Sequence, residues 1–318
     1  MSKRRALAIA ALMLGLAPGT FVRTEVPDRQ AQLLTITPVE DLPEASALGG
    51  FTREGVWELT SPNIDFGGYS ALVTFGRRGN LVAWSDRGMS MTFARPGTAH
   101  ASTVRFARVE DRGPLSAAFP DIEAAMRDPG TGQVWLALEN ANAVLRYDAE
   151  GRFAAARQPP EWAGWGKNAG PEAMERLPDG RFIVLPEAHA TGLVYPSDPT
   201  DEVAAREFGV TIPGGYRATD LAALPDGRLL VLLRKVVLGY PPFTAALGLA
   251  DPSELERGDA LTVRVLLDLD ALVPPDNFEG MATEPRADGL VDVWLIADDN
   301  VASFKRTLLA RLTFDPPS

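Results

Sequence analysis

A repeat of about fifty residues is the feature that most restricts how this chain can fold. Five segments share one plan, in which a polar residue and a few small or apolar residues lead to a turn, an apolar run and a second polar residue. The first polar positions are Ser70, Glu123, Glu172, Asp220 and Glu279, separated by 53, 49, 48 and 59 residues. One four-stranded propeller blade takes roughly 40–50 residues. We therefore predict an all-β fold, a single β-propeller.

The turns inside the repeats favour β-hairpins. Leu-Pro-Asp-Gly-Arg occurs at 177–181 and again at 224–228. Pro presets φ, Asp caps the turn and Gly supplies a positive φ. From about residue 25 onward the chain has room for roughly six four-stranded blades of this length. Segments 32–59 and 307–314 fall outside the five repeats, and we expect the two termini to complete one closing blade.

Charge and composition exclude several classes of protein. The formal net charge is −11 and the chain has no Cys. A nucleic-acid partner needs a basic face to bind phosphates, so none is expected. Thiol nucleophiles, thiolate zinc sites and disulfides are ruled out. An acidic balance is compatible with cation binding, although acidity can also serve only to keep an exported protein in solution.

The N-terminus predicts export. Lys3, Arg4 and Arg5 precede a 12-residue apolar run at 6–17, which is too short to span a bilayer comfortably and ends in small residues. We expect a signal peptide and short leader at 1–24 and the propeller domain at 25–318. This predicts a periplasmic or secreted protein with no stable membrane insertion, and the paired arginines are compatible with twin-arginine export. The alternative is a buried N-terminal helix.

The repeats predict a cluster of carboxylates at one end of the propeller. Glu172 and Glu187 lie 15 residues apart around the turn at Asp179, so a hairpin places both at the same end of adjacent strands. The other repeats show comparable spacings. Carboxylates this close repel one another unless a cation intervenes. The alternative is that each polar residue only forms a hydrogen bond with the neighbouring blade.

A hard divalent cation suits this set of oxygen donors. Ca²⁺ takes six to eight oxygen ligands from carboxylates, amides and carbonyls, whereas zinc is disfavoured because the chain has no Cys and only two His. His189 is interpreted as a surface or loop residue. The expected metal ligands are Asp86, Glu139, Glu187, Asp220, Asn277, Asp298, Asp299 and Asn300.

Nine short motifs in order resemble the phytase-like family, also called esterase-like activity of phytase. They lie at 66–70, 85–88, 121–124, 168–173, 177–181, 216–221, 277–282, 298–300 and 306–309. The resemblance covers roughly 49–314 and implies an exported propeller with a calcium-assisted phosphoesterase or esterase activity. Pro186 directly before Glu187 departs from a regular strand end, which makes Glu187 a less certain ligand.

Three functions remain open at this point: a Ca²⁺-dependent phosphoesterase, a metal-dependent lactonase or ester hydrolase, and a non-catalytic binding or scaffold propeller. For the first, the expected partner is a small phosphate ester or another anionic ester. Glu172 and Glu279, each flanked by a small residue, and the similar Glu123 are the expected catalytic residues. The expected substrate-binding residues are Arg87, Lys167, Arg234 and Lys235. No oligomeric state follows from the sequence.

Overall fold

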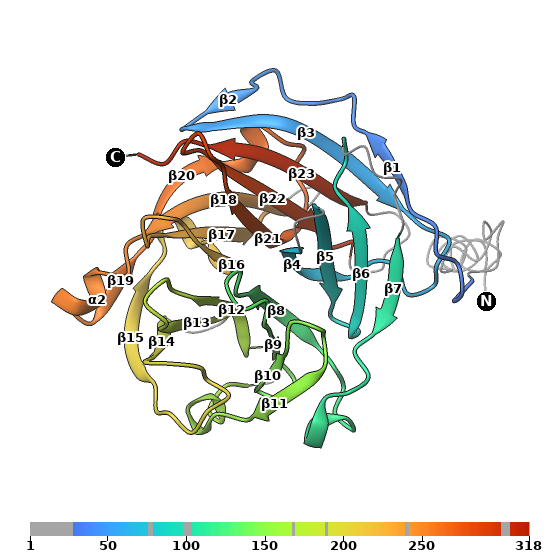
Figure 1. Cartoon of the computed structure of the whole chain (residues 1–318). Helices are drawn as coiled ribbons and strands as arrows, with labels where there is room; N and C mark the ends of the chain where they lie inside the picture. Colours follow the sequence, from blue (N-terminus) through green and yellow to red (C-terminus); the bar gives the residue numbers. More distant parts are fainter. Residues whose placement is uncertain are drawn as a thin grey trace, which may run out of the picture.

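The computed structural model describes residues 28–75, 79–97, 104–166, 169–187, 190–238, 242–299 and 306–317. Over these residues the chain is a β-propeller whose blades are arranged around a common axis (Figure 1), so the all-β prediction is confirmed. In this part of the chain no helix has the length and apolar character needed to cross a membrane. The leader expected at 1–24 lies outside the described residues.

There are five blades, each built on a sheet of at least four strands. The first is β4 (Tyr69–Phe75), β5 (Asn80–Ser85), β6 (Met89–Ala94) and β7 (Arg105–Arg108). The second is β8 (Ile122–Arg127), β9 (Val134–Leu138), β10 (Ala143–Tyr147) and β11 (Phe153–Arg157). The third is β12 (Pro171–Arg176), β13 (Phe182–Pro186), β14 (Thr191–Tyr195) and β15 (Arg206–Thr211). The fourth is β16 (Arg217–Ala223), β17 (Leu229–Val236), β18 (Phe243–Ala250) and β20 (Arg264–Asp268).

The fifth blade closes the ring and corrects the expected blade count from six to five. It joins β21 (Phe278–Pro285) and β22 (Val291–Ala297) to β23 (Thr307–Phe314) and β3 (Phe51–Thr60), and β1 (Thr35–Pro38) and β2 (Ala47–Leu48) both pair with β3. The fifth repeat supplies only its two inner strands, and their open edge needs partners for its backbone N–H and C=O groups. The terminal segments provide those partners, so the prediction that the two termini complete one closing blade is confirmed, but that blade is the fifth and not a sixth.

An insertion explains the longest repeat spacing. Between β18 and β20 the chain forms the short helix α2 (Glu254–Arg257) and β19 (Ala260–Thr262). Strand β19 leaves the fourth blade and pairs in parallel with β15 of the third. The remaining helical turns are η1 (Gly113–Leu115), η2 (Pro160–Trp162), η3 (Pro213–Gly215) and η4 (Leu269–Ala271). The insertion lengthens this repeat without adding a blade and ties two neighbouring blades together.

The hydrophobic core lies between the blades. Each of five clusters of buried side chains joins two neighbouring blades, and together they close the ring. Between the third and fourth blades, for example, Ile183 of β13 packs in one cluster with Val231 of β17. Both faces of most sheets are therefore covered by a neighbour, which is why strands such as Phe182–Pro186 are apolar throughout.

Both Leu-Pro-Asp-Gly-Arg segments form the predicted turns. In the first, the Gly180 N–H donates to the Leu177 carbonyl at 2.9 Å, and Asp179 accepts the N–H of Arg181 at 3.0 Å. Gly180 has a φ of 94°, a backbone conformation that costs little only for glycine. These turns lie at the ends of the hairpins remote from the polar positions that open each repeat.

Candidate functional site

A β-bulge interrupts the innermost strand of every blade. Near its start the pairing with the second strand skips one residue, which is left unpaired. Bulges of this kind bend a strand and redirect a side chain. The five skipped residues are Ser70, Glu123, Glu172, Thr219 and Glu279.

The fourth bulge corrects the repeat alignment by one residue. The skipped residue is Thr219, and Asp220 pairs normally with Leu232. Asp220 is buried, and its two oxygens accept the N–H groups of Leu221 at 2.8 Å and of Met281 on the next blade at 2.6 Å. The structure thus gives Asp220 the blade-to-blade contact that was the alternative explanation for the whole cluster.

Three sets of five equivalent residues surround the axis at this end, and we call them the mouth ring. One set is the skipped residues. The second set lies at the end of the second strand of each blade, next to the bulge. The third set lies at the start of the innermost strand, two residues before each skipped residue, and the register of each hairpin places it opposite the second set. The second set is Asp86, Glu139, Glu187, Arg234 and Asp298, and the third set is Gly68, Asp121, Gly170, Arg217 and Asn277.

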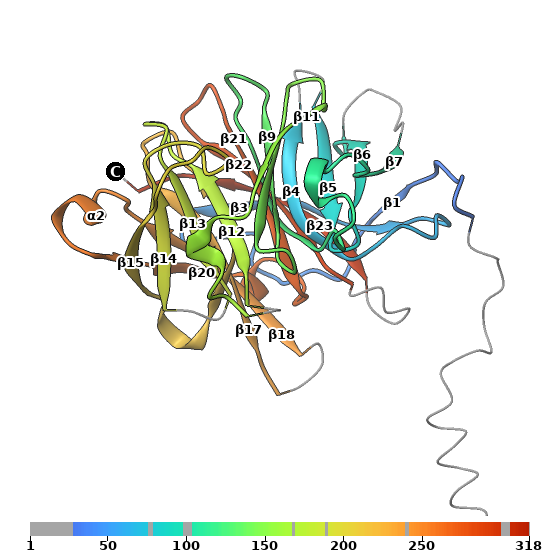
Figure 2. The ribbon, with the colours of Figure 1, turned by 90° about the horizontal axis from the view of Figure 1, so that it is seen from below.

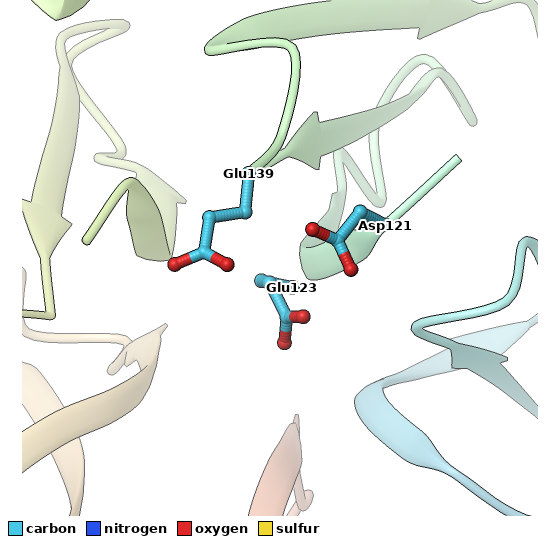
Figure 3. A group of neighbouring side chains, drawn as sticks. All are labelled: Asp121, Glu123 and Glu139. Carbon is cyan, nitrogen blue, oxygen red and sulfur yellow. The ribbon is translucent and has the colours of Figure 1, made fainter. Parts of the chain in front are cut away.

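Eight of these fifteen residues carry a carboxylate and two are arginines. Asp121, Glu123 and Glu139 each offer a carboxylate oxygen within 4.8 Å of the others (Figure 3). Glu139, Glu172 and Glu187 do the same, so Glu139 belongs to both groups. Oxygens this close, with no histidine or thiol among them, are the donors that a hard divalent cation takes. The donor set therefore fits Ca²⁺ or a similar ion.

Both arginines belong to the fourth blade, and on the first blade the Arg87 guanidinium, outside the ring, lies 3.9 Å from the Asp86 carboxylate. Arg234 forms ion pairs with Glu279 and, at 3.1 Å, with Glu187. Arg217 lies 3.5 Å from Glu187, and its side chain is 56% exposed. Because Arg234 bridges carboxylates of the third and fifth blades, it neutralises part of the ring, whereas no ion pair within the described residues reaches Asp121, Glu123 or Glu139.

Burial raises the pKa of several ring carboxyls. Burial is the main reason why the pKa of Glu123 lies well above its ordinary value, and the negative charges of Glu172 and Glu279 raise it further. The pKa of Glu172 is raised in the same way, by burial and then by Glu279 and Glu187. Burial also raises the pKa of Glu279, but Arg234 and a hydrogen bond from Asn277 at 2.9 Å oppose the shift. Protons or a cation must offset this repulsion.

Several predicted residues have structural contacts outside the two carboxylate groups. The Arg87 guanidinium donates to the Phe66 and Gly67 carbonyls, both at 3.1 Å. Asp299 accepts the N–H of Gly68 at 2.9 Å and the hydroxyl of Thr307 at 3.0 Å. The contacts to Phe66, Gly67 and Gly68 hold the segment that enters the first blade.

The remaining predicted residues lie in the ring, beside it or outside the described residues. The Lys235 ammonium lies 5.6 Å from the centre of the Tyr216 ring. Asp298 lies near Asn277, whose Nδ2 donates to it at 3.4 Å. The predicted residues Lys167 and Asn300, and also His189, lie outside the described residues.

Sequence reasoning missed Asp121 and Arg217. Each lies two residues before the skipped residue of its repeat, at the position that Asn277 occupies in the fifth blade. Asn277 was recognised as an oxygen donor at this offset. Applying the same offset to every repeat would have identified both residues.

The fold and this ring define the class, a five-bladed propeller with an acidic site at one end of its axis. The chain belongs to the phytase-like family, described as esterase-like activity of phytase, which matches residues 64–301. No protein with a curated description matches the sequence.

Solved propellers resemble the structure only distantly. A gluconolactonase from Xanthomonas campestris is 13% identical with a TM-score of 0.48, covering 92% of this chain and 100% of that one. Virginiamycin B lyase from Staphylococcus aureus is 12% identical with a TM-score of 0.43, covering 83% and 100%.

Proposed function

We propose that this protein is an exported, divalent-cation-dependent hydrolase of small esters, with phosphate monoesters as its substrates. The observation that carries the proposal is the asymmetric mouth ring, which has carboxylate groups on the second and third blades and arginines on the fourth. Family membership supports ester hydrolysis, and the basic start and apolar run at the N-terminus support export. We propose Ca²⁺ as the ion because the donors in both carboxylate groups that the structure describes are oxygens.

In this proposal Asp121, Glu123 and Glu139 hold the cation. When bound, such an ion neutralises phosphate oxygens and lowers the pKa of an attacking water. Arg234 and Arg217 bind and orient the phosphate from the opposite side through charge-assisted hydrogen bonds. Glu279 and Asn277 fix the position of the Arg234 guanidinium, as their hydrogen bonds to it indicate.

Glu172 is the proposed general acid. It lies next to Glu139, and burial and the neighbouring carboxylates raise its pKa, which favours the protonated form that a general acid needs. That proton can pass from the carboxyl oxygen to the leaving alkoxide. Asp220 and Asp299 stay outside the proposed ligand set, because backbone N–H groups and a hydroxyl already bind their oxygens.

The direct test is phosphate release from a small aryl phosphate by the purified protein. We expect turnover in millimolar Ca²⁺ and at least about a hundredfold less after treatment with a chelator, as for a step that depends on the ion. Restoring Ca²⁺ should restore the rate. Opening of a lactone without phosphate release would favour the lactonase alternative, and no turnover on either substrate would favour a binding propeller.

The stability of the chelated protein should fall as the pH rises from 5 to 8. Glu123 and Glu172 have raised pKa values, so they bind protons more tightly in the folded than in the unfolded protein. Their contribution is fully present below the unfolded pKa of about 4.3 and is lost as the pH rises through the folded pKa.

Ca²⁺ at a hundredfold excess over its Kd should restore about 2.7 kcal/mol at pH 8. Thermal melts at both pH values, with Ca²⁺ and with chelator, measure the effect. Melting temperatures that respond to neither pH nor Ca²⁺ would contradict the cation site.

A further inference from the structure

Exposed apolar side chains gather at the end of the propeller that carries the mouth ring. Among the described residues, six large apolar side chains are exposed. Four of these six lie at this end, three in loops and Val236 as the last residue of β17. Ile64 and Phe119 lie on the segments that enter the first and second blades, and Val236 and Leu238 follow Arg234 at 72% and 107% exposure. Of these, Val236 and Leu238 are close together on one hairpin, and adjacent exposed apolar side chains beside a polar site favour a place where a ligand binds.

The β17–β18 hairpin builds the largest part of this apolar rim. It extends beyond the body of the propeller in Figure 2, and its strands pair over their whole length, from Leu229 with Ala250 to Val236 with Phe243. The Arg234 guanidinium lies 5.7 Å from the centre of the Phe243 ring. The hairpin therefore places apolar and aromatic surface directly beside the cationic side of the mouth ring.

The charge of the ring limits how many anionic groups a ligand can bring. Its fifteen positions hold two arginines against eight carboxylates, and both arginines are on the fourth blade. Beyond the phosphate that the arginines and the proposed cation at Asp121, Glu123 and Glu139 can neutralise, further phosphates on the same substrate would lie against the remaining carboxylates, and like charges at that distance repel. A single phosphate beside the fourth blade meets two guanidinium groups, and the carboxylates next to it, Glu187 and Glu279, are already paired with them.

We propose that the substrate is an amphiphilic phosphate monoester: one phosphate beside Arg234 and Arg217, joined to an aryl or alkyl group that packs on Val236 and Leu238. The inference rests on the proposed hydrolase function and specifies its substrate. It excludes polyphosphorylated sugars as the preferred substrates. The apolar group supplies binding through removal of apolar surface from water, on the hairpin that also carries Arg234.

The test compares 2-naphthyl phosphate with glycerol 2-phosphate, which share the reacting group and differ in the apolar part. We expect wild-type kcat/KM to favour the naphthyl ester by at least about tenfold, equivalent to about 1.4 kcal/mol. The double variant Val236→Ser/Leu238→Ser should lose most of that ratio. Leu48→Ser is the matched control, since Leu48 is 51% exposed on the outer edge of the fifth blade and should keep the ratio.

Binding of the non-hydrolysable pair naphthylmethylphosphonate and methylphosphonate, measured by calorimetry, separates this inference from the proposed function. A binding preference for the naphthyl compound that is lost in the double variant supports the apolar rim even if nothing is hydrolysed. Turnover with equal kcat/KM for both esters, or faster turnover of inositol hexakisphosphate, overturns the inference and leaves the hydrolase intact. Binding to phosphatidylcholine vesicles through Val236 and Leu238, with no ligand preference, also overturns it.

Discussion

Glu172→Gln is expected to lower kcat/KM for a phosphate monoester by at least about a hundredfold, the usual contribution of a positioned general acid. Gln keeps the shape of Glu172 but cannot supply a proton. It also removes one charge from a crowded ring, so the chelated protein should melt at a higher temperature than wild type at pH 8. Phosphate release and a melting curve on the same preparation measure both effects.

Glu175→Gln is the matched control. Glu175 lies three residues further along β12, and burial raises its pKa to about 8. It lines a cavity of about 490 Å³ whose other walls come from the strand ends remote from the mouth ring. We expect this variant to retain wild-type turnover. If Glu172→Gln also kept full turnover while melting higher, the ring would be structural and the enzyme proposal would fail.

Arg234→Gln should produce the largest loss of stability. It leaves Glu187 and Glu279 without the cation that joins them, and breaking a buried pair in this way costs about 3–5 kcal/mol. Loss of Arg234 also removes the interaction that holds down the pKa of Glu279. The deficit should therefore be larger at pH 8 than at pH 5, where the carboxyls take up protons.

Urea unfolding of the chelated protein at both pH values measures this pH dependence. Arg217→Gln is the control: its side chain is more than half exposed, so its ion pair contributes at most about 1 kcal/mol. Compared with Arg234→Gln, Arg234→Lys should recover more of the stability than of the phosphate binding. An ammonium group keeps the positive charge but cannot form the bidentate hydrogen bonds of a guanidinium. A deficit for Arg234→Gln that is equal at pH 5 and pH 8 would contradict the electrostatic account.

Local patterns were sufficient to predict the hairpins and most of the mouth ring. The turn at Asp179-Gly180 dictates which residues return to the same end of a hairpin, so Glu172 and Glu187 could be placed together from spacing alone. Counting residues from the turn in the same way also aligned Arg234 correctly with the carboxylates on the second strands of the other blades. Chain geometry within one hairpin depends on few residues, which is why these inferences succeeded.

The closing blade, the exact register of the fourth repeat and the sharing of charge between blades were decided by tertiary structure. The termini join the fifth blade because β22 needs an edge partner, a requirement that arises only when the ring closes. Thr219 and not Asp220 is skipped, and Asp220 instead binds the Met281 N–H across the blade interface.

The sequence by itself determined a propeller with repeated acidic strand ends, because the period of the repeat and the turn residues act within each hairpin. Only the packed structure decided that five blades close the ring, that Glu139 meets Glu172 and Glu187 of the next blade, and that Arg234 lies between Glu187 and Glu279. These contacts join residues of different strands and different blades. Their distances depend on how the sheets pack around the axis, and no spacing along the chain encodes that packing.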